Sequence, residues 1–126
     1  MRKIIAVIDD DRAIRNGVSS LLRSAGLDVR LYENAESFLN EGVARKADAA
    51  ITDIQMPGMS GLDLQETLKD RQPDLPVLFM TAFPEDALRQ RAMARGAVCF
   101  LSKPFNAADL LFWIEKATAP AGRGQE

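Results

Sequence analysis

Several short apolar runs in the sequence end in a side chain that can take part in chemistry. Three consecutive carboxylates, 9–11, follow the first such run, Asp53 ends another, and Thr81 ends a third. Lys103 follows the last of these runs. Each residue alone has an ordinary structural explanation, because acidic residues cap helices, threonine is common in turns and lysine usually lies in solvent. Their repeated position at the ends of apolar runs instead indicates one shared site.

A site built from these side chains would be rich in oxygen and would contain no imidazole, because the chain has no histidine. Clustered carboxylates favour Mg²⁺ or Mn²⁺ over zinc. Their like charges raise the pKa of at least one carboxyl group unless a cation lies between them. Lys103 offers a compact positive charge and Thr81 a hydroxyl donor for phosphoryl oxygens. Asp53 can act as a nucleophile that forms an aspartyl phosphate, so the set matches an in-line phosphoryl transfer.

The residues between these positions predict alternating strands and helices. Continuous apolar runs bounded by turn residues indicate buried strands, and apolar residues spaced three and four apart indicate helices. Strands that are apolar throughout are typical of a parallel sheet covered by helices on both faces. Because the carboxyl ends of parallel strands share one edge, the candidate residues should converge there. The predicted strands are 3–8, 27–32, 47–53, 77–80 and 98–101, and the predicted helices are 12–25, a short helix after Asn34, 60–71, 84–95 and a last helix after Asn106.

Turn and capping residues predict where two of these helices begin and end. Asp11 or Asp10 can cap the first helix, and Gly26 suits the position just after it. Pro84 suits the first turn of the fourth helix, which should continue to Gly96.

The length of 126 residues predicts a single domain. We expect it to span 1–118, with the small, polar segment 119–126 forming a flexible tail or the start of a linker. The net charge of −2 and the scattered basic residues give no positive field for nucleic acid. The single cysteine, Cys99, excludes an intrachain disulfide and is predicted to be a buried, unreactive thiol. The N-terminal apolar run is too short for a signal peptide, and no segment reaches the about 18 apolar residues of a membrane span, so we infer a cytoplasmic protein.

Four motifs together resemble the receiver domain of bacterial response regulators, the CheY-like family. They are VIDDD at 7–11, TDIQMPGMSG at 52–61, MTA at 80–82 and KPF at 103–105. The resemblance extends over about 3–117 of the chain. It implies a single α/β domain of the doubly wound (βα)5 flavodoxin-like type, with a five-stranded parallel sheet in the order 2-1-3-4-5 and five helices.

The resemblance also implies a phosphoacceptor and a metal site. Asp53 would accept the phosphoryl group. Asp10, Asp53 and the backbone carbonyl of Gln55 would bind Mg²⁺ directly, with Mn²⁺ as a possible substitute. Asp9 would hold the ion through its water ligands.

Further residues would contact the phosphoryl group and transmit its presence. By resemblance, Thr81 and Lys103 contact phosphoryl oxygens, and Phe100 occupies the aromatic switch position. We predict that phosphorylation draws Thr81 toward the site and lets Phe100 rotate inward, which reshapes the face formed by the fourth helix, fifth strand and fifth helix. Phe83 is hypothesised to shield the phosphoryl group from water, and the alternative is that it lies in an exposed partner-binding surface.

The implied function is a phosphorylation-dependent switch of a two-component system. The phosphodonor would be a partner histidine kinase, and the target an output domain or partner protein. The segment 97–105 looks most like receivers that precede a helix-turn-helix output domain, so transcription is the expected output. A phosphorylation-dependent homodimer is plausible, whereas direct contact with nucleic acid or a membrane is not expected. We expect no enzymatic activity beyond self-phosphorylation from a phosphodonor and slow autodephosphorylation.

Three other classes of protein would require different residues at these positions. A phosphatase with an aspartyl nucleophile would want a second aspartate at the position of Gln55. A flavin mononucleotide binder of the same topology would want a phosphate-binding loop after the first strand, where the acidic triplet would repel phosphate. A degenerate receiver that binds partners without phosphorylation would be expected to lack some of the site residues, and all of them are present.

Overall fold

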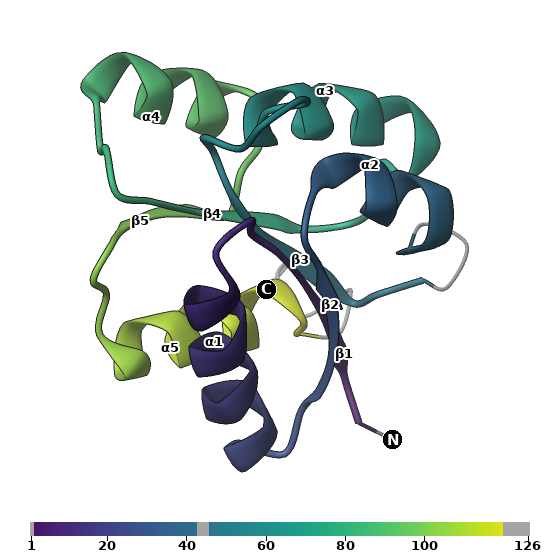
Figure 1. Cartoon of the computed structure of the whole chain (residues 1–126), viewed down its shortest axis with the longest axis vertical. Helices are drawn as coiled ribbons and strands as arrows, with labels where there is room; N and C mark the ends of the chain where they lie inside the picture. Colours follow the sequence, from purple (N-terminus) through teal and green to yellow (C-terminus); the bar gives the residue numbers. More distant parts are fainter. Residues whose placement is uncertain (1, 43–45, 120–126) are drawn as a thin grey trace.

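Five parallel strands form one sheet in the order β2-β1-β3-β4-β5 (Figure 1). The structure is a computed structural model that describes residues 2–42 and 46–119. The strand order confirms the predicted α/β architecture. The strands are β1 Ile4–Ile8, β2 Asp28–Tyr32, β3 Ala49–Asp53, β4 Val77–Thr81 and β5 Cys99–Ser102.

The helices cover both faces of this sheet. Figure 1 shows α1 and α5 on one face and α2, α3 and α4 on the other. The described helices are α1 Arg12–Ser24, α2 Ala35–Ser37, α3 Gly61–Arg71, α4 Asp86–Ala94 and α5 Ala107–Ala117, and a π-helical segment η1 Phe38–Gly42 continues α2. None of these helices in the described residues combines the length and the apolar character that crossing a membrane requires.

Two buried clusters fill the space between the sheet and its two helical layers. Successive side chains of a strand point to opposite faces, so each central strand contributes to both clusters. In β4, Phe79 packs toward α2, α3 and α4, whereas Leu78 and Met80 pack toward α1 and α5. Because both faces are covered, β3 and β4 are buried at every position, which explains their mostly apolar sequences.

The helix ends follow the capping chemistry of the sequence. The Asp11 carboxylate accepts hydrogen bonds from the amides of Ala13 and Ile14, which identifies it as the cap of α1. Ser60 and Asp63 form a reciprocal capping box at the start of α3. Gly26, just after α1, has a φ of +87°, a left-handed conformation that glycine adopts without strain.

Two expectations about the elements were incorrect or incomplete. Pro84 does not lie in the first turn of α4, because Glu85 is its N-cap residue and the helix begins at Asp86. The Glu85 amide donates to the carbonyl of Phe83, so Pro84 lies within a tight turn that precedes the helix. The π-helical segment after α2 was not predicted, and the predicted tail lies outside the described residues from position 120 onward.

Cys99 is buried among the apolar residues between the sheet and α5, as predicted. Burial raises the pKa of its thiol to about 12, so the nucleophilic thiolate is scarce at neutral pH. We therefore assign Cys99 a packing role.

Candidate functional site

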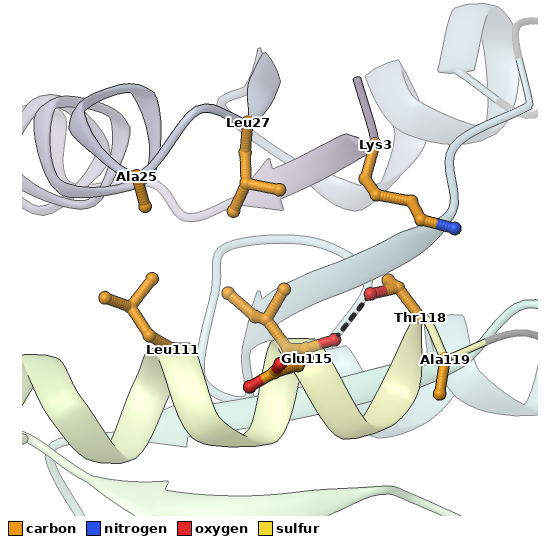
Figure 2. A pocket seen from close by; sticks show the side chains of 8 residues that line it. Lys3, Ala25, Leu27, Leu111, Glu115, Thr118 and Ala119 are labelled. Carbon is orange, nitrogen blue, oxygen red and sulfur yellow. Dashed lines mark hydrogen bonds between the residues drawn. The ribbon is translucent and has the colours of Figure 1, made fainter. Parts of the chain in front are cut away.

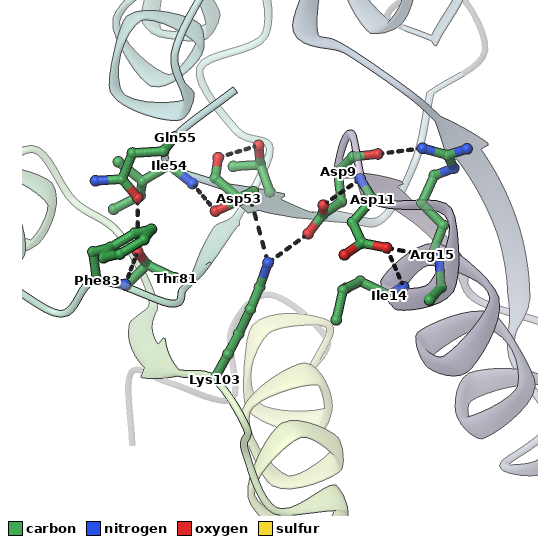
Figure 3. A network of polar contacts seen from close by, with 12 residues as sticks. Asp9, Asp11, Ile14, Arg15, Asp53, Ile54, Gln55, Thr81, Phe83 and Lys103 are labelled. Carbon is green, nitrogen blue, oxygen red and sulfur yellow. Dashed lines mark hydrogen bonds and ion pairs between the residues drawn. The ribbon is translucent and has the colours of Figure 1, made fainter. Parts of the chain in front are cut away.

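The predicted site residues converge at the carboxyl edge of the sheet (Figure 3). Asp9 directly follows β1, Asp53 is the last residue of β3, Thr81 is the last of β4, and Lys103 directly follows β5. The strand registers place Asp53 beside Met80 and Thr81 beside Ser102, so the strands end at nearly the same level. The expectation that residues distant in sequence meet at one edge is confirmed.

The partly buried ammonium group of Lys103 joins the ends of β1, β3 and β5. Lys103 Nζ lies 2.9 Å from Asp9 Oδ2 and 3.3 Å from Asp53 Oδ2. Asp9 is fully buried and Asp53 is only 7% exposed. The ion pairs are therefore shielded from solvent and bring together residues that are 94 and 50 positions apart in the chain.

The electrostatics of this group leave the charge of the Asp53 carboxylate incompletely compensated. Burial, and then the negative charge of Asp9, raise the pKa of Asp53, although Lys103 and the Ile54 amide act in the opposite direction. Burial alone would lower the pKa of Lys103, but its hydrogen bond to Asp9 and the charges of the two carboxylates together raise it. Lys103 thus stays charged, while Asp53 lacks full charge compensation.

Three carboxylates lie close enough to share one cation. Asp9, Asp10 and Asp53 can each offer an oxygen, and these oxygens lie within 4.8 Å of one another. Asp10 is exposed, so this group opens to solvent on one side. An all-oxygen donor set with excess negative charge fits Mg²⁺, which commonly retains several water ligands. The residues present therefore fit the predicted ion.

Backbone groups hold both buried carboxylates in fixed directions. Asp53 Oδ1 accepts a hydrogen bond of 2.7 Å from the Ile54 amide, so its other oxygen faces Lys103. Asp9 Oδ1 accepts one of 2.9 Å from the Asp11 amide. Arg15 donates to the backbone carbonyl of Asp9 at 2.6 Å, which ties the first turn of α1 to the end of β1.

The hydroxyl group of Thr81 is engaged by the loop after Asp53. Thr81 Oγ1 donates to Gln55 Oε1 at 3.0 Å and accepts from the Phe83 amide at 3.0 Å. Sequence reasoning had assigned Gln55 a role through its backbone carbonyl only, and it missed this side-chain contact. The sequence signal that could have indicated this contact is the position of Gln55, two residues beyond Asp53 at the end of a strand.

The remaining predicted residues lie at the margin of the site. Phe100, on β5, is partly buried and packs against the cluster beneath α2, α3 and α4. Phe83 is 61% exposed, and Figure 3 shows its ring beside the Gln55–Thr81 contact. Both positions are compatible with the roles predicted for them, which concern a phosphorylated state.

A separate apolar pocket lies at the opposite edge of the sheet (Figure 2). Its volume is about 440 Å³, and it lies between α5 and the segments that lead into β1 and β2. Leu27 and Leu111 face each other across it, with Lys3 at one side. Because these segments precede their strands, the pocket is remote from Asp53 and is not part of the candidate site.

Residues 5–115 match the response regulator receiver domain family. The chain is 36% identical over 123 residues to "Response regulator protein TmoT" of Ectopseudomonas mendocina, covering 98% of this chain and 56% of that protein. It is 39% identical over 117 residues to "Transcriptional regulatory protein FixJ" of Bradyrhizobium diazoefficiens, covering 93% and 57% respectively. The chain thus spans about half the length of these relatives.

Solved structures share the same fold. A CheY-like response regulator receiver domain protein from Methanospirillum hungatei superposes with a TM-score of 0.88 at 26% identity, covering 94% of each chain. The family match covers β2 to β5 and all of β1 except Ile4, and it includes Asp9, Asp53, Thr81 and Lys103. The chain therefore belongs to the response regulator receiver domain family of two-component signalling proteins.

Proposed function

We propose that this domain is a phosphorylation-dependent switch that accepts a phosphoryl group on Asp53 from a partner histidine kinase. The observation that carries the proposal is the pairing of Lys103 with both Asp9 and Asp53 beside the open carboxylate of Asp10. This arrangement provides a nucleophile, a fixed positive charge and an oxygen-rich cation site at one edge of the sheet.

In the proposed transfer, an Asp53 carboxylate oxygen forms a bond to phosphorus while the bond from phosphorus to the donor breaks. The leaving group, a histidine nitrogen of the kinase or the carboxylate of a small acyl phosphate, keeps the electron pair. Lys103 and the Thr81 hydroxyl balance charge on the phosphoryl oxygens. Asp9, Asp10, Asp53 and the Gln55 carbonyl would hold Mg²⁺, which when bound neutralises negative charge and orients a phosphoryl oxygen.

The proposed readout begins with the hydrogen bond between Thr81 and Gln55. A phosphoryl group on Asp53 competes with Gln55 for the Thr81 hydroxyl, so Thr81 shifts toward the site. Thr81 pairs with Ser102 in the sheet, and Phe79 pairs with Phe100. A shift at the end of β4 would therefore displace neighbouring residues of β5. Phe100 then rotates into the vacated space and reshapes the face of α4, β5 and α5.

The packing of α4 suits it to this movement. The helix buries only Ala92, and its N-cap residue makes no side-chain capping bond. Its C-terminal end is anchored to α3, because Gln65 Nε2 donates to the Ala92 carbonyl at 3.1 Å and Arg95 pairs with Glu66 at 3.3 Å. The end nearest Thr81 is therefore the easier end to displace.

The output is proposed to be transcription, through a helix-turn-helix domain or a partner protein, because the similar FixJ is named a transcriptional regulatory protein. The reshaped face would also support a phosphorylation-dependent homodimer. This domain itself would contact neither nucleic acid nor membrane, and it would act in the cytoplasm. Its only chemistry would be self-phosphorylation from a phosphodonor and slow autodephosphorylation.

The charge imbalance at Asp53 predicts that the metal-free parent is less stable than Asp53→Asn at pH 7. The raised pKa means that the folded state binds a proton at Asp53 more readily than the unfolded state. Protonation of Asp53 therefore stabilises the folded state fully at a pH below the pKa of Asp53 in the unfolded chain. This contribution is lost as the pH rises through the pKa of Asp53 in the folded protein. We expect Asp53→Asn to increase the free energy of unfolding by roughly 1 kcal/mol, which is a common size for the effect of one substitution.

Urea unfolding in the presence of a chelator measures this difference, which should narrow as the pH falls toward 4. Asp70→Asn, which removes an exposed carboxylate of α3, controls for the change in net charge. If Asp53→Asn is less stable than the parent at pH 7, the raised pKa assigned to Asp53 is contradicted.

Phosphorylation of Asp53 is tested by incubating the protein with acetyl phosphate and Mg²⁺. We expect one added phosphate group on the intact parent by mass spectrometry, and none on Asp53→Asn or when the metal is chelated, because the transfer needs the nucleophile and the cation together. Asp70→Asn should be labelled like the parent. The proposed function is wrong if the parent stays unlabelled or if Asp53→Asn is labelled equally.

The exposed ring of Phe83 predicts a slow loss of the phosphoryl group. The ring lies beside the Thr81–Gln55 contact, so we expect it to limit the approach of water to the phosphorylated carboxylate. Phosphorylated Phe83→Glu should lose its phosphoryl group several-fold faster than the phosphorylated parent. The measurement is the decay of the phosphorylated form with time. Phe112→Glu changes another exposed aromatic, on α5, and should leave the rate unchanged. Equal rates for Phe83→Glu and the parent would rule out shielding.

The proposed readout predicts structural changes when beryllofluoride, a phosphoryl mimic, is added with Mg²⁺. NMR resonances of the Gln55 side-chain amide, the Phe100 ring and α4 should shift, since Thr81 is drawn away from Gln55. Asp53→Asn should show no such shifts. Binding of the mimic without any change at Phe100 or α4 would contradict the switch.

A further inference from the structure

The loop between β3 and α3, residues 54–60, is fixed at its far end by close backbone packing. The Gly61 amide donates to the Ile54 carbonyl at 2.9 Å, which closes the loop. A Cβ atom at Gly61 would collide with the Asp53 carbonyl oxygen, so only glycine permits this approach. This contact fixes the position at which the loop ends and α3 begins.

Glu36 of α2 holds the last part of the loop, two residues before Gly61. Glu36 Oε2 accepts a hydrogen bond of 3.0 Å from the Met59 amide. A Cβ atom at Gly58 would lie 2.8 Å from the same oxygen, and Gly58 has a φ of +78°. The carboxylate therefore lies directly against the loop backbone, in space that glycine leaves free.

Glu36 is itself well positioned for this contact. It lies between Asn34, whose side chain caps α2 through the Ser37 amide, and the buried ring of Phe38. Among the ion pairs of the described residues, none involves Glu36. Its negative charge is thus used on a backbone amide, and hydrogen bonds of this charge-assisted kind are stronger than neutral ones.

We propose that Glu36 is a positioning residue for the metal and phosphoryl site. By fixing the loop at Met59, it limits the backbone positions open to Gln55, whose carbonyl would bind Mg²⁺ and whose side chain contacts Thr81. Glu36 acts through the loop and touches neither the metal nor the phosphoryl group. This inference rests on the proposed function, because it assigns the loop geometry a role in binding Mg²⁺.

Two substitutions separate positioning from simple electrostatic attraction. Glu36→Gln keeps a hydrogen-bond acceptor but removes the charge, whereas Glu36→Ala removes both. In Mg²⁺ titrations of the protein followed by NMR, we expect Glu36→Ala to bind roughly tenfold more weakly, the lower end of the loss typical for groups that orient metal ligands. Glu36→Gln should bind within about twofold of the parent, since conservative replacement keeps the Met59 contact. Glu33→Ala, a neighbouring exposed glutamate, controls for charge near α2.

Amide hydrogen exchange in the metal-free protein provides a readout that is independent of the metal. The Met59 amide should exchange faster in Glu36→Ala but not in Glu36→Gln, while amides of the central strands remain protected in both. Protection of the central strands also verifies that each variant is folded.

The outcomes distinguish the inference from the function on which it rests. If the parent itself binds no Mg²⁺, the proposed metal site fails. If the parent binds Mg²⁺ and both Glu36 variants weaken binding equally, charge rather than the hydrogen bond is responsible, and positioning by Glu36 is overturned. The same conclusion follows if Glu36→Ala binds Mg²⁺ like the parent, whether or not its Met59 amide exchanges faster.

Discussion

The pairing of Lys103 with two buried carboxylates is the interaction on which the rest of the site depends. Asp9 and Asp53 carry like charges in a region that water barely reaches, and such a pair is costly without a cation. A parallel sheet resolves this cost by topology, because it aligns the ends of β1, β3 and β5 at one edge. Lys103, at the end of the last strand, then reaches both carboxylates at once. The fold thus supplies one fixed positive charge and leaves room at Asp10 for another.

The hydrogen bonds around this centre give each polar atom a direction. Asp53 is aimed by the Ile54 amide, and Thr81 is held between Gln55 and the Phe83 amide. These contacts join the loop after β3 to the loop after β4, which is the connection that the proposed switch would use. The contact between Thr81 and Gln55 is the weakest point of this network in one respect: its acceptor is an exposed side chain that a better acceptor can replace.

The parts of the structure that follow from local pattern were predictable from the sequence. Asp53 was placed at the end of a buried strand because an apolar run stops there, and Asp11 was a recognisable helix cap. The contact of Glu36 with Met59 was not predictable, since it joins elements 23 residues apart and involves a backbone amide that no residue type identifies. Pro84 was misplaced because proline suits both a first helical turn and the turn that precedes it.

In the proposed function, the uncompensated negative charge at Asp53 would also allow the site to respond to a cation. A ligand that binds only the folded state stabilises it by mass action, and here a cation would also offset the burial and the Asp9 charge that raise the pKa of Asp53. Binding of a cation would therefore raise the free energy of unfolding. The weakly buried α4 is the element that the proposed switch would move, because one end is held to α3 by Gln65 and the other end lies nearest Thr81. With a more deeply packed α4, the site could bind the same ligands, but the proposed movement of the helix would cost more free energy.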